Sequence, residues 1–205
     1  MLHLDHVREA LARHRPELLP PEPGGHRAAV ALVLAGDPAD LHLCLIRRAE
    51  SPHDPWSGHM ALPGGRVDPW DPTVQAAAER ETAEEVGLVI QPEQLLGTLS
   101  DLPVRRRGLA GLTLSGFVYY AGPEPPVLIP NHEVAAAHWL PLTHLWDAEQ
   151  ATHHPYMHEG ERLHFPGIRV GVHVIWGLTF RVLSLFSDVL DHPLPHLEDI
   201  PGLRL

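Results

Sequence analysis

Residues 64–88 read GGRVDPWDPTVQAAAERETAEEVGL, and the fold we expect depends on this stretch. It opens with a loop that is rich in glycine and proline. Residues 73–86 then contain neither Pro nor Gly and are rich in Ala and Glu, which predicts a helix. Thr73 is placed to cap the N-terminus of this helix, and Gly87 is placed to end it.

Three glutamates share one face of this predicted helix. At about 100° per residue, Glu81, Glu84 and Glu85 fall within an arc of roughly 100°. Glu79 lies nearly opposite and is expected to face solvent. Like charges four residues apart on a helix repel each other by a few tenths of a kcal/mol per pair, which a cation between them would relieve. Mg²⁺ prefers clustered carboxylates, but solvated Glu-rich helices are also common, so the pattern alone leaves both interpretations open.

Two adjacent glycines precede the helix. Gly64 and Gly65 follow a strand-like segment and allow the backbone to approach a ligand closely, with amides free to meet phosphate and carbonyls free to bind a cation. Arg80 points away from the glutamate face and is placed to brace the loop. The loop and the helix could therefore enclose one metal–phosphate site.

The stretch 64–88 resembles the Nudix box, which is the loop–helix signature of Nudix hydrolases. Residues 80–88, RETAEEVGL, match the second half of the box, with Thr82 in the position that is usually aliphatic. Asp68 and Asp71 in the loop are similar to the boxes of the coenzyme A pyrophosphatase-like branch of the family.

Softer similarity to that branch extends over about residues 28–190, where Arg47 and Gly58 line up with the motif before the box. The resemblance implies an α/β fold, a Nudix-type α/β/α sandwich with a mixed central sheet. It also implies metal-dependent hydrolysis of the pyrophosphate bond in a small nucleoside-diphosphate-linked substrate, with coenzyme A or a derivative favoured. The alternatives are another nucleotide, such as ADP-ribose, a dinucleotide or a nucleoside triphosphate, or a Nudix sensor that binds nucleotides without cleaving them.

The resemblance assigns roles to individual residues. Binding of Mg²⁺ or Mn²⁺ is assigned to three carboxylates and one backbone carbonyl, those of Glu81, Glu84, Glu85 and Gly64. Catalysis is assigned to Glu81, Glu84 and Glu133, since the general base is either a box glutamate or a carboxylate from a later loop. Substrate contacts are assigned to Arg47, Gly64 and Gly65.

Composition sets outer limits on function. The chain has 205 residues, of which 44% are hydrophobic and 20% charged, as in an ordinary globular domain. The formal net charge of −11 argues against a nucleic-acid partner. The sequence has neither an apolar run long enough to span a membrane nor a signal-peptide core, so we expect no membrane association and a cytoplasmic location. The single cysteine, Cys44, is expected to be a small buried side chain.

The remaining elements are predicted from periodicity and turn residues. Strands are expected at 28–36, 41–49, 95–102, 112–122 and 133–142, with a hairpin turn at 37–40. Helices are expected at 4–14, 143–150 and 174–191, and 153–173 is expected to be irregular β structure. The resulting division is an N-terminal helix and linker (1–26), a Nudix hydrolase domain (27–191) and a C-terminal tail (192–205). The apolar helix 174–191 could pack on its own domain or on a twin in a homodimer.

Overall fold

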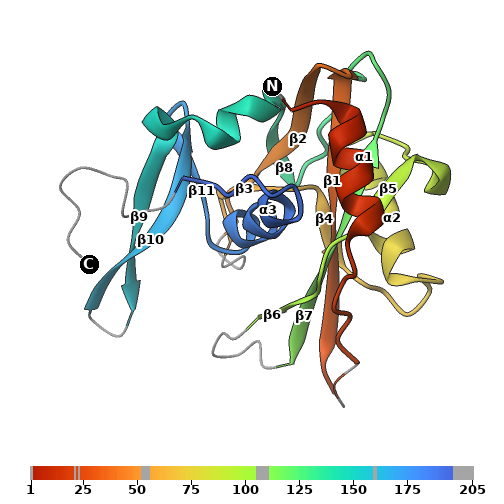
Figure 1. The fold of residues 1–205 in the computed structure, drawn as a ribbon. Coiled ribbons are helices and arrows are strands. Elements are labelled where there is room, and N and C mark those ends of the chain that lie inside the picture. Colours follow the sequence, from red (N-terminus) through yellow and green to blue (C-terminus); the bar gives the residue numbers. More distant parts are fainter. Residues whose placement is uncertain are drawn as a thin grey trace.

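A computed structural model describes residues 2–20, 22, 24–51, 56–104, 111–158 and 161–195. Within these residues the chain forms two β-sheets and three α-helices (Figure 1). In chain order the elements are α1 (Leu4–Arg13), β1 (His26–Asp37), β2 (Asp40–Arg48), β3 (Met60–Ala61), β4 (Gly64–Arg66), α2 (Val74–Val86), η1 (Pro92–Gln94), β5 (Leu95–Thr98), β6 (Leu102–Val104), β7 (Leu112–Tyr120), β8 (Val134–Pro141), η2 (Leu142–Trp146), η3 (Ala148–Gln150), β9 (Ala151–His158), β10 (Glu161–Val170), β11 (His173–Trp176) and α3 (Gly177–Val189).

The larger sheet is mixed and has β1 at its centre. Strands β3, β2, β1, β7 and β5 follow one another across it, while β8 also pairs with β2, β4 with β1, and β6 with β7. The pairing of β1 with β7 is parallel, and the other pairings are antiparallel. A strand that is covered on both faces needs apolar residues at every position, and the nearly continuous burial of β1 and β7 meets this requirement.

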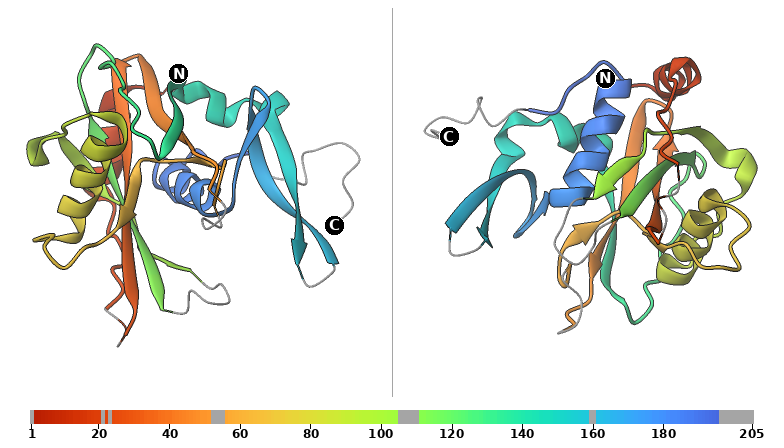
Figure 2. Two further views of the ribbon diagram at one scale, coloured as in Figure 1. Left: turned by 180° about the vertical axis from the view of Figure 1, so that it is seen from behind. Right: turned by 90° about the horizontal axis from the view of Figure 1, so that it is seen from below.

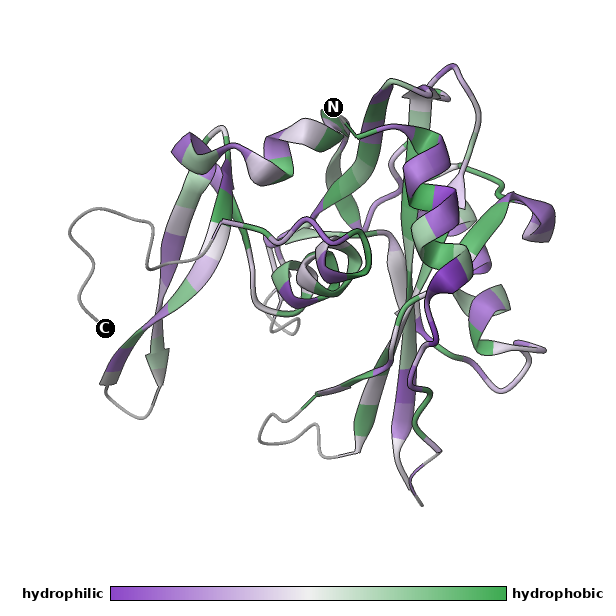
Figure 3. Cartoon of the chain, viewed as in Figure 1, coloured by the Kyte–Doolittle hydropathy of each residue, from purple (hydrophilic) through white to green (hydrophobic). Residues whose placement is uncertain are grey.

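Helices cover both faces of this sheet. Alternate residues of β1 belong to different hydrophobic clusters: Leu32 and Leu34 pack with α1 and α3, whereas Ala31 and Val33 pack with α2. Figure 2 shows α2 and α3 on opposite sides of the sheet. In Figure 3 hydrophobic colour follows the central strands, while α1 and α2 alternate between hydrophobic and hydrophilic residues. The expected α/β/α sandwich with a mixed central sheet is therefore confirmed.

A second sheet of three strands lies beside α3, in the order β11–β10–β9 (Figure 1). The prediction of irregular structure for 153–173 was wrong, because β9 and β10 form a regular antiparallel hairpin from Ala151 to Val170. The predicted start of the last helix was also wrong. Residues His173–Trp176 pair with β10, and α3 begins only at Gly177, whose φ of +64° turns the chain out of the strand.

Most of the local predictions agree with the structure. Thr73 caps α2 through its Oγ1, which accepts a hydrogen bond from the Ala76 amide at 3.0 Å, and Gly87 ends the helix at a φ of +69°. The turn from Asp37 to Asp40 joins β1 and β2. Residues 142–150 form two 3₁₀ turns rather than one short helix.

Both terminal helices pack on this chain's own core. The buried side chains of α1, Leu4, Val7 and Leu11, and those of α3, Leu183 and Phe186, belong to one cluster. Helix α3 therefore packs on its own domain, and a homodimer stays a prediction, as does the expected division into three segments. Among the described residues, no helix is both long enough and apolar enough to cross a membrane.

We predict that the thiol of Cys44 is unreactive in the folded chain. Its side chain is fully buried in β2, and burial, together with the charge of Glu85, raises its pKa to about 12. Since the thiolate is the nucleophile, a pKa three units above that of the unfolded thiol lowers the reactive fraction about 1,000-fold at pH 8. Iodoacetamide at pH 8 should leave Cys44 unmodified, as measured by intact mass, until denaturant is added. Rapid labelling of the native protein would contradict the buried position.

Candidate active site

Strand β4 and helix α2 approach so closely that only glycine fits between them. A Cβ atom at Gly64 would stand 2.2 Å from the carbonyl oxygen of Ala29, and the φ of Gly64 is +148°, in a region that favours glycine. A Cβ atom at Gly65 would stand 2.4 Å from the carboxylate carbon of Glu81. The two glycines thus bring the backbone of β4 against the glutamate face of α2.

Glu85 is the most deeply buried carboxylate of this face. Glu85 is only 2% exposed, and its Oε2 accepts a hydrogen bond from the Gly64 amide at 2.8 Å. Nη1 of Arg48 lies 3.7 Å from its Oε1. Burial raises the Glu85 pKa to about 7, although the Gly64 bond and Arg48 oppose this, and the charges of Glu81 and Glu133 raise the pKa further.

Glu81 and Glu84 share one donor group. Nη1 of Arg80 donates to Oε1 of Glu81 at 3.0 Å and to Oε2 of Glu84 at 3.1 Å. The Glu81 side chain is 16% exposed and that of Glu84 is 55% exposed. Burial raises the pKa of Glu81, and the neighbouring carboxylates add to this effect, whereas Arg80 opposes it.

The same arginine also holds the loop before the helix. Nε and Nη2 of Arg80 donate to the two carboxylate oxygens of Asp71, both at 2.9 Å, and Nη2 donates to the carbonyl oxygen of Arg66 at 3.2 Å. A hydrogen bond from Arg80 is the main reason that the Asp71 pKa is lowered. The expectation that Arg80 braces the loop is confirmed, but the expectation that it points away from the glutamate face was wrong, because its Nη1 donates to Glu81 and Glu84.

Glu133 faces the same space from the loop before β8. That loop is attached to the end of α2, because the Asn131 amide donates to the Glu85 carbonyl at 2.9 Å and the Ile129 amide to the Val86 carbonyl at 2.8 Å. The Glu133 side chain is largely exposed. Its negative charge contributes to the raised pKa of both Glu81 and Glu85, so the loop brings a fourth carboxylate to the site.

The arginine that contacts Glu85 is Arg48 and not Arg47. Successive residues of a strand face opposite sides of a sheet, and Arg47 is paired with Met60, whose side chain belongs to the cluster on the α3 side. Sequence reasoning missed Arg48, because the residues of β2 before it are apolar on both faces and do not show which face α2 covers. The contact of Arg47 with substrate stays a prediction.

The prediction that Glu79 faces solvent was wrong. Its Oε1 accepts hydrogen bonds from the hydroxyl of Tyr119 at 3.1 Å and from the side-chain amide of Gln75 at 2.8 Å, and the residue is partly buried. Tyr119 is buried in β7, and this burial raises its pKa. Glu79 is therefore a structural residue on the face of α2 that packs against the sheet.

The chemistry of the donor set fits a hard divalent cation. Glu81 and Glu85 are carboxylates whose pKa values are raised by burial and by the charges of neighbouring glutamates, and a cation bound to them would oppose both effects. In the part of the chain that the structure describes, no three His, Cys, Asp or Glu side chains already form a ligand cluster, since Arg80 bonds to two of the three helix carboxylates.

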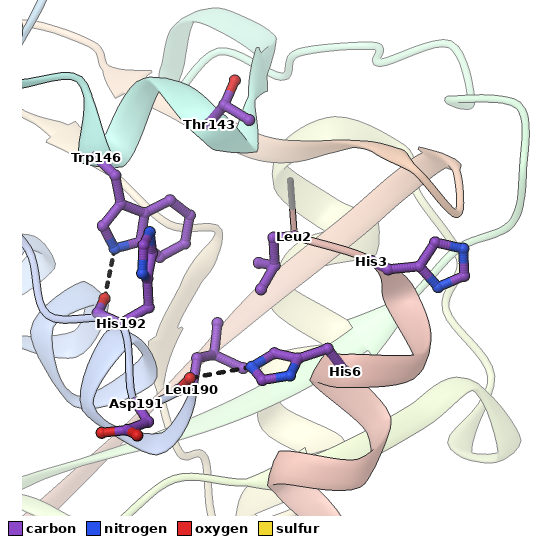
Figure 4. Close-up of a pocket in the computed structure, with 8 residues that line it drawn as sticks. All are labelled: Leu2, His3, His6, Thr143, Trp146, Leu190, Asp191 and His192. Atoms are coloured by element: carbon purple, nitrogen blue, oxygen red, sulfur yellow. Dashed lines mark hydrogen bonds between the residues drawn. The ribbon is translucent and has the colours of Figure 1, made fainter.

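A separate cavity lies between the N-terminal helix, η2 and the end of α3 (Figure 4). Its volume is about 520 Å³, and it is bordered by two hydrogen bonds, from Trp146 to the His192 carbonyl and between His6 and the Leu190 carbonyl. None of its lining residues belongs to the carboxylate site, and the side chains of His6 and Trp146 are bonded to backbone carbonyls. We therefore place the candidate active site at β4 and α2 and not in this cavity.

The sequence matches a known family and several of its members. The family model described as NUDIX domain matches residues 25–159. The human mitochondrial coenzyme A diphosphatase NUDT8 is 33% identical over 171 residues, which are 82% of this chain and 69% of that protein. The mouse protein of the same name is 34% identical over 190 residues, which are 89% of this chain and 85% of that protein. Since both relatives are named as mitochondrial, the cytoplasmic location stays a prediction.

A solved structure shows the same fold. The crystal structure of a MutT/nudix family protein from Enterococcus faecalis superposes with a TM-score of 0.58 at 22% identity. The match covers 84% of this chain and 65% of that chain, so this chain spans less than two thirds of the solved one. At this level of identity the likeness concerns the fold alone.

We predict that Asp71→Asn destabilises the protein. The side chain of Asp71 is nearly buried against Arg80, and hydrogen bonds to charged groups contribute about 1.5–3 kcal/mol, so the free energy of unfolding should fall by that amount. Because the Asp71 pKa is lower in the folded chain, the advantage of the unmodified protein should persist above about pH 4 and fade at lower pH. Urea unfolding at pH 7 and pH 3 measures both effects.

The matched control is Asp5→Asn. Asp5 forms a surface pair with Arg8 at 3.6 Å, and both side chains are largely exposed. Exposed pairs contribute about 0–1 kcal/mol, so this control should change the unfolding free energy far less. Equal losses in the two variants would show that Arg80 does not brace the loop.

Proposed function

This chain belongs to the Nudix family of hydrolases, and from this premise we propose that it cleaves the pyrophosphate bond of coenzyme A or a derivative. Family membership makes it a pyrophosphohydrolase, and Nudix hydrolases generally require divalent cations. The single observation that carries the proposed site is the glutamate face of α2, held against the two glycines of β4, with Glu85 bonded to the Gly64 amide at 2.8 Å.

The choice of substrate rests on the named relatives. Both are coenzyme A diphosphatases, and the matches cover more than four fifths of this chain. Coenzyme A joins a nucleotide to a pantetheine arm through a pyrophosphate, so its cleavage gives 3′,5′-ADP and 4′-phosphopantetheine. We propose this cleavage as the main activity.

Glu81, Glu84 and Glu85, with the carbonyl of Gly64, are the residues that would hold Mg²⁺ or Mn²⁺. When bound, the cation would neutralise the negative pyrophosphate oxygens and so make phosphorus accessible to a water nucleophile. The chain's own contribution is orientation, because the Gly64 amide and the guanidinium of Arg48 fix the Glu85 carboxylate from two sides.

The remaining roles go to residues around this face. Glu133 is the proposed general base, because its carboxylate is exposed, faces Glu81 and Glu85, and can take a proton from the attacking water. Arg47 and the amides of Gly64 and Gly65 are proposed to contact substrate phosphates. Arg80 keeps the loop in place through Asp71 and thereby keeps the glycines against the helix.

We predict that Glu85→Gln abolishes most of the hydrolysis. The change keeps the size of the side chain but removes the charge that the cation requires, and loss of a group of this kind typically lowers kcat by about 100-fold or more. The assay follows 3′,5′-ADP release from coenzyme A with Mg²⁺ or Mn²⁺, and EDTA should stop the reaction in the unmodified protein.

Glu79→Gln is the control for this experiment. It makes the same chemical change on the same helix, but Glu79 bonds to Tyr119 and not to the site, so hydrolysis should stay within a few-fold. Full activity of Glu85→Gln would exclude this site. AMP and ribose 5-phosphate from ADP-ribose, with coenzyme A left intact, would identify a different substrate for it.

We predict that Gly65→Ala lowers activity more than stability. The new Cβ would meet the end of the flexible Glu81 side chain, so the carboxylate would be displaced while the backbone stays in place.

Gly97→Ala is the contrast, because its Cβ would stand 2.9 Å from Cβ of Leu11 in the core between α1 and β5. That variant should lose thermal stability but keep its activity per folded molecule. The kcat and the thermal unfolding temperature are measured for both variants. A Gly65→Ala variant that loses stability but keeps its activity would contradict the placement of Glu81.

A further inference from the structure

Five rings gather where the second sheet meets the edge of the first. His154 stacks on Trp176 with ring centres 4.0 Å apart and planes at 17°, and His59 meets the same indole at 4.9 Å and 60°. Tyr156 and Phe165 lie 5.7 and 6.0 Å from it. We call these residues, His59, His154, Tyr156, Phe165 and Trp176, the ring cluster.

The ring cluster is not part of either hydrophobic core. All five residues are only partly buried, and none belongs to the two clusters of buried side chains. Burial lowers the pKa of His154, so its imidazole is neutral at pH 7 and can stack as an uncharged ring. The cluster therefore presents ring surface and imidazole nitrogens at the surface of the molecule.

The ring cluster lies beside the carboxylate site. The carbonyl of His59 accepts a hydrogen bond from the amide of Arg48 at 3.0 Å, and the guanidinium of Arg48 lies 3.7 Å from the Glu85 carboxylate. The backbone of His59 is thus bonded to Arg48, and the side chain of Arg48 reaches the carboxylate of Glu85.

A second arginine lies next to Arg48 on β2. Arg47 precedes Arg48 on β2 and is paired with Met60, the residue after His59. Its side chain is partly buried, and its guanidinium forms no hydrogen bond or ion pair with a described residue. Its positive charge is available to a phosphate group that binds near the rings.

We propose that the ring cluster binds the base of the nucleotide substrate, with the ring of His154 as the principal stacking surface. This inference deepens the proposed function and rests on it for the identity of the substrate. Arg47 on β2 is paired with Met60, which follows His59, so a positive charge and the rings are neighbours here, as phosphate and base are in a nucleotide. Stacking on an aromatic residue is tolerant of the base, and its loss on alanine substitution weakens binding about tenfold.

The opposing explanation is that these rings only attach the second sheet to β3. The two explanations differ for ligands with and without a base. A stacking role affects only ligands that carry a base, whereas an attaching role affects all ligands of the site alike.

The experiment measures the binding of two probes, AMP and ribose 5-phosphate, by calorimetry without substrate turnover. The unmodified protein should bind AMP more tightly than ribose 5-phosphate, because only AMP carries a base. In His154→Ala the affinity for AMP should fall about tenfold, to the level of ribose 5-phosphate, while the affinity for ribose 5-phosphate stays unchanged. His59→Ala should also lower the affinity for AMP. It tests the ring cluster independently if His154→Ala does not fold.

His153→Ala is the matched control. It removes an imidazole from the neighbouring position of β9, but His153 faces the other side of the hairpin, where its ring meets His164 at 4.7 Å. This control should bind both probes as the unmodified protein does. Thermal unfolding of all variants confirms that they are folded.

The outcomes separate this inference from the proposed function. Three results would overturn the role of the ring cluster, even if hydrolysis is observed. The first is unchanged AMP binding in His154→Ala and His59→Ala, and the second is an equal loss of affinity for both probes. The third is an unmodified protein that does not bind AMP more tightly than ribose 5-phosphate. The protein could also prefer AMP, lose this preference in His154→Ala, and cleave no pyrophosphate. That result would uphold the role of the ring cluster and overturn the proposed hydrolysis.

Discussion

The rest of the structure depends on how closely helix α2 approaches strand β4. Gly64 has the backbone of β1 on one side and the carboxylate of Glu85 on the other, and Gly65 lies directly against Glu81. A side chain at either position would have to displace the backbone of β1 or a carboxylate. The hydrogen bond from the Gly64 amide to Glu85 therefore does two things at once. It sets the distance between the helix and the sheet, and it fixes an acidic group next to a backbone that is free of side chains.

The same closeness creates an electrostatic imbalance. The carboxylates of Glu81, Glu84 and Glu85 share one face of α2, the charge of Glu133 acts on two of them, and the guanidinium groups of Arg48 and Arg80 are their positive partners. Burial outweighs these arginines, because the pKa values of Glu81 and Glu85 are raised and not lowered. Asp71, which has two hydrogen bonds to Arg80, shows the opposite shift. Charge compensation is thus complete in the loop and incomplete on the helix face, where a divalent cation would supply the difference.

The parts of this arrangement that the sequence predicts are the local ones. Thr73 and Gly87 could be identified as the ends of α2 because a cap involves atoms within a few residues. The errors concern contacts between distant segments. Glu79 is buried by Tyr119, forty residues later, and the strand at 173–176 exists only because β10 pairs with it. Arg48 was missed because the face of β2 that α2 covers cannot be known until the sheet is assembled.

The short strand β3 lies in the chain between His59 of the ring cluster and the glycines of the candidate active site. On one side it pairs with Ile46 and Arg47 of β2, and on the other the hydroxyl of Thr179 in α3 donates to the Met60 carbonyl at 3.1 Å. His59 precedes the strand and Gly64 comes five positions after His59, so the chain between them spans at most about 18 Å. Because β3 is held from both sides, this separation cannot vary freely. Trp176 ends β11, an edge strand of the second sheet, and the turn at Gly177 starts α3, which is bonded to β3 through Thr179. Strand β3 and this helix thus connect the segments that carry the ring cluster to the glycine backbone of the candidate active site.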